Sequence, residues 1–207
     1  MKIYLLDINK EMTDAWFKYF EQTNVEVVNT DFETFMTEHP DVEAIVSPAN
    51  SFGLMDGGYD KAITNYFGPE LMKAVQKEII RVWWGEQPVG TSLSVVIRSK
   101  HFTKQIDEEK TLELHPILIH TPTMRTPEQI IDPRIVYQCM RTTLIEAVDR
   151  EVDSIVIPAF GGCTGKVPCE VIAKMMFLAF EQLSNVPENL NWGYAYHIAK
   201  NLLEAKH

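Results

Sequence analysis

The stretch from Ala44 to Ile63 constrains the fold most, because it joins a short apolar run to a glycine-bearing loop and a helix start. Residues 44–46 are apolar on both faces, which is typical of a central strand in a parallel sheet. Pro48 has no backbone N–H group and therefore ends the strand. Asp60 favours the start of the next helix, because its carboxylate interacts well with the helix dipole. A strand, a glycine-rich turn and a helix start form a cradle of N–H groups for an anion, although a tight turn with a helix cap gives the same pattern.

A second glycine-rich loop follows the apolar residues 154–157 and ends at Pro168. It contains Gly161, Gly162 and Gly165, whereas an ordinary strand-to-helix turn uses one glycine. Glycine permits a positive φ and a close approach of the backbone to a ligand. Pro168 starts the next helix, whose N-terminus adds its dipole. Because both loops follow apolar strands, the two together predict an anion site more specifically than either does alone.

Segments with the pattern of strands alternate along the chain with segments that have helical periodicity. The expected strands are residues 2–6, 25–28, 44–46, 89–97, 116–121 and 154–157. This alternation predicts an α/β fold, namely a three-layer α/β/α sandwich with a mostly parallel mixed central sheet. Ligands of such sheets bind at the carboxyl ends of the strands, where Asp31, Asn50 and Thr121 stand. We expect the charged residues 105–113 to form a surface hairpin or loop.

The length of 207 residues fits a single domain covering residues 1–207, with residues 190–207 as an appended C-terminal helix. In that helix Trp192, Tyr196 and Leu203 share one apolar stripe with Ala199.

The composition, with 45% apolar and 23% charged residues, is that of a soluble globular protein. The formal net charge of −10 argues against charge-driven binding of nucleic acid, and it means that backbone dipoles must hold a phosphate ligand. The three cysteines cannot all pair, the N-terminus is too acidic for a signal peptide, and no run is long enough to span a membrane. We therefore expect a cytoplasmic protein without a membrane partner.

Asn50, the step Gly57-Gly58 and Asp60 follow a strand with a spacing that resembles the signature of the macrodomain family. Residues 161–165 resemble the second phosphate-binding loop of that family, and the resemblance covers roughly residues 25–183. It implies a macrodomain-like fold that binds ADP-ribose, either free or attached to a macromolecule. It further implies hydrolysis of an ADP-ribosyl linkage of the mono-ADP-ribosyl or O-acyl-ADP-ribose type. We expect no cofactor.

Position by position, the resemblance implies that Asn50 meets the ribose farther from adenine and that Asp60 is the catalytic carboxylate. Asp60 would act as a general base or would stabilise the charge that develops on the ribose. Asp31 would accept the adenine amino group and Phe32 would cover the ring; without the resemblance, Asp31 is equally well interpreted as the cap of a helix at 33–39. The ligand-binding residues expected in this way are Asp31, Phe32, Ser51, Gly57, Gly58, Tyr59, Gly161, Gly162, Cys163, Thr164 and Gly165.

Three departures from the family pattern change these expectations. Cys163 stands where many members have glycine. Asp56 adds a carboxylate, which is either a second catalytic group or, as we prefer, a solvated group at the loop rim. The family usually ends in a strand, whereas this chain ends in a helix. We therefore expect the strand at 3–6 to take the vacant place between the strands at 25–28 and 154–157.

Other functions stay open. A reader that binds ADP-ribose without turnover has the same spacing, and a phosphatase acting on ADP-ribose 1″-phosphate would share the pocket. A thiol nucleophile at Cys163 or Cys169 is conceivable, because the pKa of a thiol can fall near a helix N-terminus. The residue after Lys166 is neither Ser nor Thr, which argues against a P-loop. His115 and His120 fall on opposite faces of one strand, so we expect no zinc site.

Overall fold

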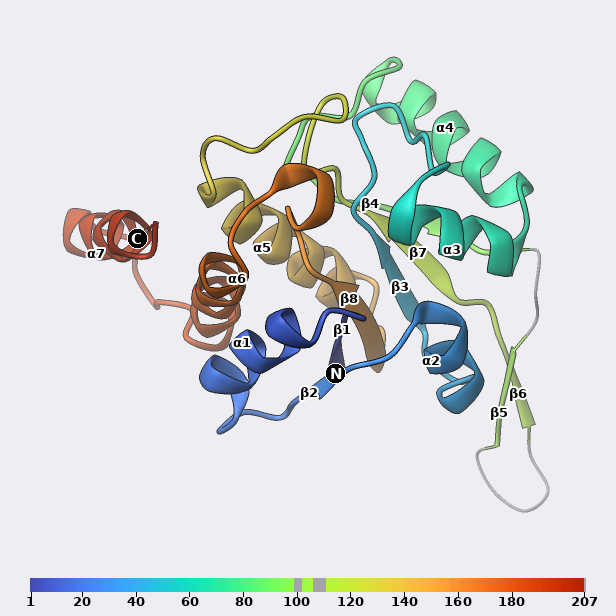
Figure 1. The fold of residues 1–207 in the computed structure, drawn as a ribbon, viewed down its shortest axis with the longest axis horizontal. Helices are drawn as coiled ribbons and strands as arrows, with labels where there is room; N and C mark the ends of the chain where they lie inside the picture. Colours follow the sequence, from blue (N-terminus) through green and yellow to red (C-terminus); the bar gives the residue numbers. More distant parts are fainter. Residues whose placement is uncertain (99–101, 106–110, 207) are drawn as a thin grey trace.

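The computed structural model describes residues 1–98, 102–105 and 111–206. Its centre is a six-stranded sheet with the strand order β2-β1-β8-β3-β7-β4 (Figure 1). The strands of this sheet are β1 (Lys2–Leu6), β2 (Val25–Val28), β3 (Ala44–Ser47), β4 (Leu93–Val96), β7 (Ile117–His120) and β8 (Ser154–Pro158). Neighbouring strands pair in parallel, except that the edge strand β4 runs antiparallel to β7. The expected mostly parallel mixed sheet is therefore confirmed.

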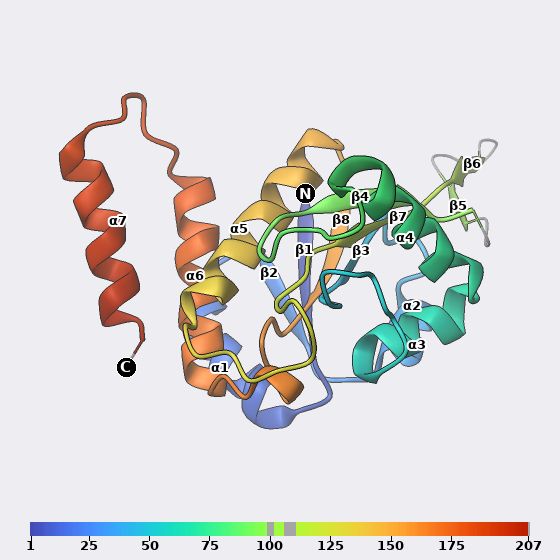
Figure 2. The same cartoon turned by 90° about the horizontal axis from the view of Figure 1, so that it is seen from above.

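Helices cover both faces of the sheet, as Figures 1 and 2 show. One face carries α1 (Lys10–Phe20), α5 (Arg134–Asp149) and α6 (Cys169–Ser184). The other face carries α2 (Phe32–Glu38), α3 (Gly58–Phe67) and α4 (Glu70–Trp83). Successive side chains of a strand point to opposite faces, so Leu5 joins the first core and Leu6 joins the second. These two apolar cores confirm the three-layer α/β/α sandwich.

The position of β1 confirms the prediction made for the first strand. Ile3 lies beside Val25 of β2 on one side and beside Ile155 of β8 on the other. The first strand thus fills the place between β2 and β8. As a result Asp7, which follows β1, lies at the same sheet edge as the loop that follows β8.

The strand expected at residues 89–97 is shorter than predicted, because β4 covers only Leu93–Val96. Gly90 has a φ of 78°, which an extended strand does not allow, and its N–H group donates to the carbonyl of Pro122 at 2.9 Å. In the expected hairpin region, β5 (Phe102–Gln105) and β6 (Thr111–Leu114) form an antiparallel pair. Residues 106–110 of that prediction lie outside the described residues.

A last helix, α7 (Trp192–Glu204), lies against the outer side of α6 and outside the three layers (Figure 2). None of its own residues is fully buried. Within the described part of the chain, no helix is long and apolar enough to cross a membrane.

Candidate functional site

The loops after β3, β7 and β8 meet at the carboxyl edge of the sheet. Asn50 forms a parallel bridge with Met124, and the N–H group of Ser51 donates to the carbonyl of Met124 at 3.2 Å. The N–H group of Ile130 donates to the carbonyl of Gly165 at 2.9 Å. Three loops that are far apart in the sequence are therefore joined into one surface, at the edge where open α/β sheets bind ligands.

Asp60 stands in the first turn of α3 and faces the end of β3. Its Oδ1 atom accepts a hydrogen bond of 2.6 Å from the Oγ atom of Ser47, the fully buried last residue of β3. Burial raises the pKa of Asp60 to about 7, and the hydrogen bond from Ser47 works against that rise. A carboxyl group with a pKa near 7 can give or take a proton at neutral pH, which suits general acid–base chemistry.

Tyr59 precedes Asp60 and places a neutral phenol hydroxyl in the same region. Its hydroxyl oxygen is buried and has no hydrogen-bond partner among the described residues. Burial raises the pKa of Tyr59 well above its usual value, and the nearby charges of Asp60 and Asp7 add to the rise. A buried polar atom without a partner is expensive, so this hydroxyl is suited to receive a polar group of a ligand.

Asp7 is a group of this region that the sequence reasoning did not include among the site residues. Its Oδ1 atom accepts from the N–H group of Asn9 at 2.8 Å, and burial raises its pKa. The sequence does hold a signal for it, because Asp7 directly follows an apolar strand whose carboxyl end lies at this edge.

The side chain of Asn50 forms hydrogen bonds to the backbone of its own loop. Its Oδ1 atom accepts from the N–H groups of Phe52 at 3.1 Å and Leu54 at 3.3 Å, and its Nδ2 atom donates to the carbonyl of Leu54 at 3.0 Å. These bonds use both lone pairs of Oδ1 and one of the two Nδ2 hydrogens. Ser51 is also buried, and its Oγ atom has no hydrogen-bond partner in the described part of the chain.

Asp31 is the N-cap of α2, which is one of the two interpretations that the sequence allowed. Its carboxylate accepts from the N–H group of Thr34 at 2.9 Å and from the hydroxyl of Thr34 at 2.7 Å, and these bonds lower its pKa. Phe32 is buried in the second core, where its ring meets those of Tyr59 and Tyr66 edge to face. Asp31 is exposed to solvent, whereas the buried ring of Phe32 does not present a face for a base to stack on.

Gly57 and Gly58 open α3 on an exposed surface. Gly58 has a φ of 53°, and a Cβ atom on either glycine would meet no described atom within 4 Å. The space over this turn is therefore open to a ligand. The N-terminus of α3 adds unpaired N–H groups and a favourable dipole for an anion.

Some glycines of the second loop are needed for packing against neighbouring side chains, and not only to let a ligand approach the backbone. A Cβ atom on Gly161 or Gly165 would lie 3.0 Å or 2.8 Å from the Cδ1 atom of Ile130. Ile130, which the sequence reasoning missed, therefore requires these two glycines. Between them, Cys163 and Thr164 are exposed in a short 3-10 turn. The structure thus places the accessible part of this loop at residues 162–164.

His120 and Gln87 form a buried hydrogen-bonded pair beside the end of β3, and the sequence did not predict that they would support the site. The Nδ1 atom of His120 lies 2.8 Å from the Oε1 atom of Gln87, whose Nε2 atom donates to the carbonyls of Thr91 and His120. Burial lowers the pKa of His120 to about 4, so the imidazole is neutral at pH 7. His120 pairs in register with Ser47, which places it next to the residue that holds Asp60. Among the described residues, no group of three His, Cys, Asp or Glu side chains could hold a metal ion.

A mixed six-stranded sheet between two helical layers, with glycine-rich loops at its carboxyl edge, defines a three-layer α/β domain. The family model described as "Macro-like domain" matches residues 7–191, and the chain therefore belongs to the Macro-like domain family. A sequence relative, an uncharacterized protein of Aquifex aeolicus, is 34% identical over 138 residues, which cover 66% of this chain and 71% of that protein.

Solved structures with the same fold include two macrodomains. The Oceanobacillus iheyensis macrodomain with ADP has a TM-score of 0.56 at 21% identity, over 79% of this chain and 83% of that one. The macrodomain of Mycobacterium tuberculosis DarG has a TM-score of 0.53 at 22% identity, over 70% of this chain and 86% of that one. At these identities the likeness establishes the fold.

Proposed function

We propose that the chain binds ADP-ribose at the carboxyl edge of its sheet and hydrolyses an ADP-ribosyl linkage of the mono-ADP-ribosyl or O-acyl-ADP-ribose type. The observation that carries the hydrolytic part is Asp60, a carboxyl group with a pKa of about 7 beside the open turn at Gly57 and Gly58. The binding part is supported by the Oceanobacillus iheyensis macrodomain, whose solved structures include one with ADP and one of a mutant with ADPR.

The diphosphate would be held by backbone dipoles. The two loops lead into the N-termini of α3 and α6, whose N–H groups and helix dipoles would contribute to holding the phosphates. This arrangement suits a chain with a net charge of −10, because it binds phosphate without a basic patch. The hydroxyls of Tyr59 and Ser51 have no partner in the described structure and would meet polar groups of the ligand.

In the hydrolytic step, Asp60 would act as a general base. It takes a proton from a water molecule, the water oxygen bonds to the anomeric carbon of the distal ribose, and the bond from that carbon to the target oxygen breaks. The proton held by Asp60 passes to the leaving oxygen or to solvent, and ADP-ribose and the free target are released. In an O-acyl-ADP-ribose the activated water would add to the acyl carbon instead, and the bond from that carbon to the ribose oxygen would break. Ser47 orients the carboxylate, so its hydroxyl contributes through positioning.

The test uses a target protein that carries labelled ADP-ribose on a carboxylate side chain, with O-acetyl-ADP-ribose as the second substrate. We expect the wild type to release the label and Asp60→Asn to lose at least about a hundredfold in rate, the usual contribution of a general base. Asp56→Asn is the matched control, because it removes an exposed carboxylate from the same loop and should leave the rate within about twofold.

Calorimetry with ADP-ribose, ADP and NAD separates the remaining outcomes. Binding of ADP-ribose without release of label from either substrate would identify a reader. Release of inorganic phosphate from ADP-ribose 1″-phosphate would identify a phosphatase. Heat from none of the three ligands would overturn the proposal as a whole.

A further inference from the structure

The outer face of α7 is an apolar stripe that nothing in the described structure covers. Trp192, Tyr196 and Leu203 are 75%, 69% and 56% exposed, and Ala199 is exposed between them. The rings of Trp192 and Tyr196 stack on each other with centroids 5.7 Å apart. The positions i, i+4, i+7 and i+11 lie on one side of a helix, so the four side chains form a continuous strip.

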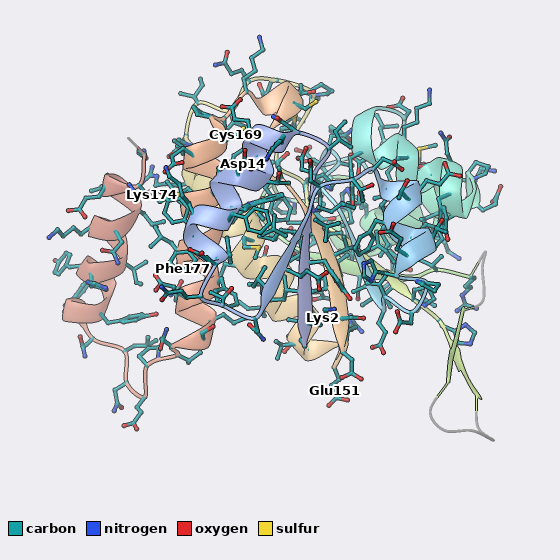
Figure 3. The ribbon with its side chains drawn as sticks, turned by 60° about the horizontal axis from the view of Figure 1, so that its bottom comes forward. Lys2, Asp14, Glu151, Cys169, Lys174 and Phe177 are labelled. Atoms are coloured by element: carbon teal, nitrogen blue, oxygen red, sulfur yellow. The ribbon has the colours of Figure 1, made fainter. Side chains whose placement is uncertain are left out.

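The inner face of α7 is fixed to α6 by polar contacts, which determines the direction of the stripe. The Nε2 atom of Gln182 donates to the hydroxyl of Tyr194 at 2.7 Å. At the other end, the Nζ atom of Lys174 donates to the carbonyl of Glu204 at 3.0 Å, and Figure 3 shows Lys174 on the side of α6 that faces α7. These contacts hold one side of α7 inward and turn the apolar stripe to solvent.

We propose that this stripe binds the same stripe of a second copy of the chain, with the two α7 helices antiparallel. The spacing of the four residues is four, three and four positions, which is the same in both directions. In an antiparallel pair, Trp192 therefore lies opposite Leu203 of the other copy, and Tyr196 lies opposite Ala199. Each large ring meets a smaller side chain, as close packing between two helices requires.

Charge favours a second copy at this surface. Residues 189–199 contain no Asp, Glu, Lys or Arg, although the whole chain carries a net charge of −10. Two acidic chains repel each other over most of their surfaces, whereas Trp192, Tyr196 and Ala199 lie in a segment without these charges. Lys200 and Glu204, which border Leu203, pair with each other at 3.7 Å and are 73% and 63% exposed, so their charges lie at the rim of the contact. The family model ends at Asn191, one residue before the stripe begins, so the stripe belongs to the part of the chain outside the shared domain.

The area of the stripe predicts a weak and reversible dimer. Bare Trp and Tyr side chains offer about 150–250 Å² each, so at their exposed fractions Trp192 and Tyr196 leave on the order of 300 Å² for contact. With Leu203 and Ala199, a pair of copies would bury on the order of 800 Å², which lies in the range of transient complexes below about 1,200 Å². An apolar patch of on the order of 400 Å² on one copy is also of the size that is often functional.

The test is sedimentation equilibrium of the whole chain from low to high micromolar concentration. We expect the average mass to rise from 23.7 kDa toward twice that value. Tyr196→Glu and Ala199→Lys should each weaken association by about tenfold or more, because each places a charge in the apolar contact between the two copies. Ile80→Glu is the matched control, since Ile80 is an apolar residue of α4 that is 64% exposed, and it should leave association unchanged.

A mixture of the two variants tests the antiparallel register. In the mixed dimer the carboxylate introduced at position 196 of one chain would face the ammonium group introduced at position 199 of the other. An equimolar mixture should therefore associate more tightly than either variant alone. A wild type that stays monomeric over the whole range would overturn the proposal. So would unchanged association of both single variants, or a mixture no tighter than its components.

Discussion

At the scale of single residues, Asp60 is a group whose environment differs strongly between the folded and unfolded chain. In the folded state its pKa is about 7, compared with an ordinary value of 3.8. Between about pH 4 and pH 7 the folded state therefore binds more protons than the unfolded state, and stability falls as the pH rises through this window. His120 has the opposite slope, because its pKa of about 4 in the folded state lies below its ordinary 6.5.

The variant Asp60→Asn removes the pH dependence of stability that Asp60 causes and leaves the pH dependence that His120 causes. We expect the variant to gain stability relative to the wild type as the pH rises from 5 to 8, by at least about 1 kcal/mol. Urea unfolding of both proteins at pH 5 and pH 8 measures this difference, and Asp56→Asn is the control. A difference in stability between wild type and Asp60→Asn that does not change with pH would contradict the raised pKa of Asp60.

At the scale of elements, the two glycine-rich loops differ in what their glycines do. Gly161 has a φ of 76°, and a Cβ atom there would lie within 3.2 Å of the side chains of Ile130, Val136 and Val167. Gly161→Ala should therefore destabilise the fold by about 2 kcal/mol, through backbone strain and overpacking together. The measurement is the midpoint of urea unfolding with the slope held constant.

Gly57→Ala is the partner experiment on the first loop. Its φ of −137° suits any residue and the space around it is open, so the only expected cost is that alanine caps a helix less well than glycine, and stability should fall by less than about 1 kcal/mol. If the turn lines the ADP-ribose site, the same change should weaken ADP-ribose binding in calorimetry. A large loss of stability in Gly57→Ala together with unchanged binding would show that the loop is structural.

The elements also show which features the sequence could predict. The place of β1 was predictable, because the segment that follows α6 has the pattern of a helix and not of a strand that could fill the gap beside β8. The start of β4 was not, since the positive φ of Gly90 depends on its bond to the loop at Pro122. The contact between Ser47 and Asp60 joins residues 13 positions apart and exists only because α3 packs on the end of β3. Ser47 and His120 are polar residues at the ends of apolar strands, and this position is the feature of the sequence that indicates a side chain supporting the site.

At the scale of the whole molecule, the sheet with its two helical layers and the C-terminal helix differ in how they are held. α6 buries apolar side chains from Val171 to Ala179, whereas no residue of α7 is fully buried. The half-buried Leu202 of α7 packs against the first core and Ala205 directly after the helix is buried there, whereas polar contacts hold much of the rest. An ion pair of 3.1 Å between Lys206 and Asp132 follows the helix, and such partly exposed ion pairs contribute little to stability. We therefore expect α7 to open independently of the rest of the chain.

Hydrogen exchange measures this difference directly. At low micromolar concentration the amides of α7 should exchange through local opening, at least about a hundredfold faster than those of β1, β3 and β8, which should require global unfolding. Raising the concentration should slow exchange in α7 alone, because pairing of two stripes protects that helix and not the sheet. Exchange of α7 at the rate of β8, at every concentration, would mean that the helix and the sheet form one cooperative unit and that no second copy protects it.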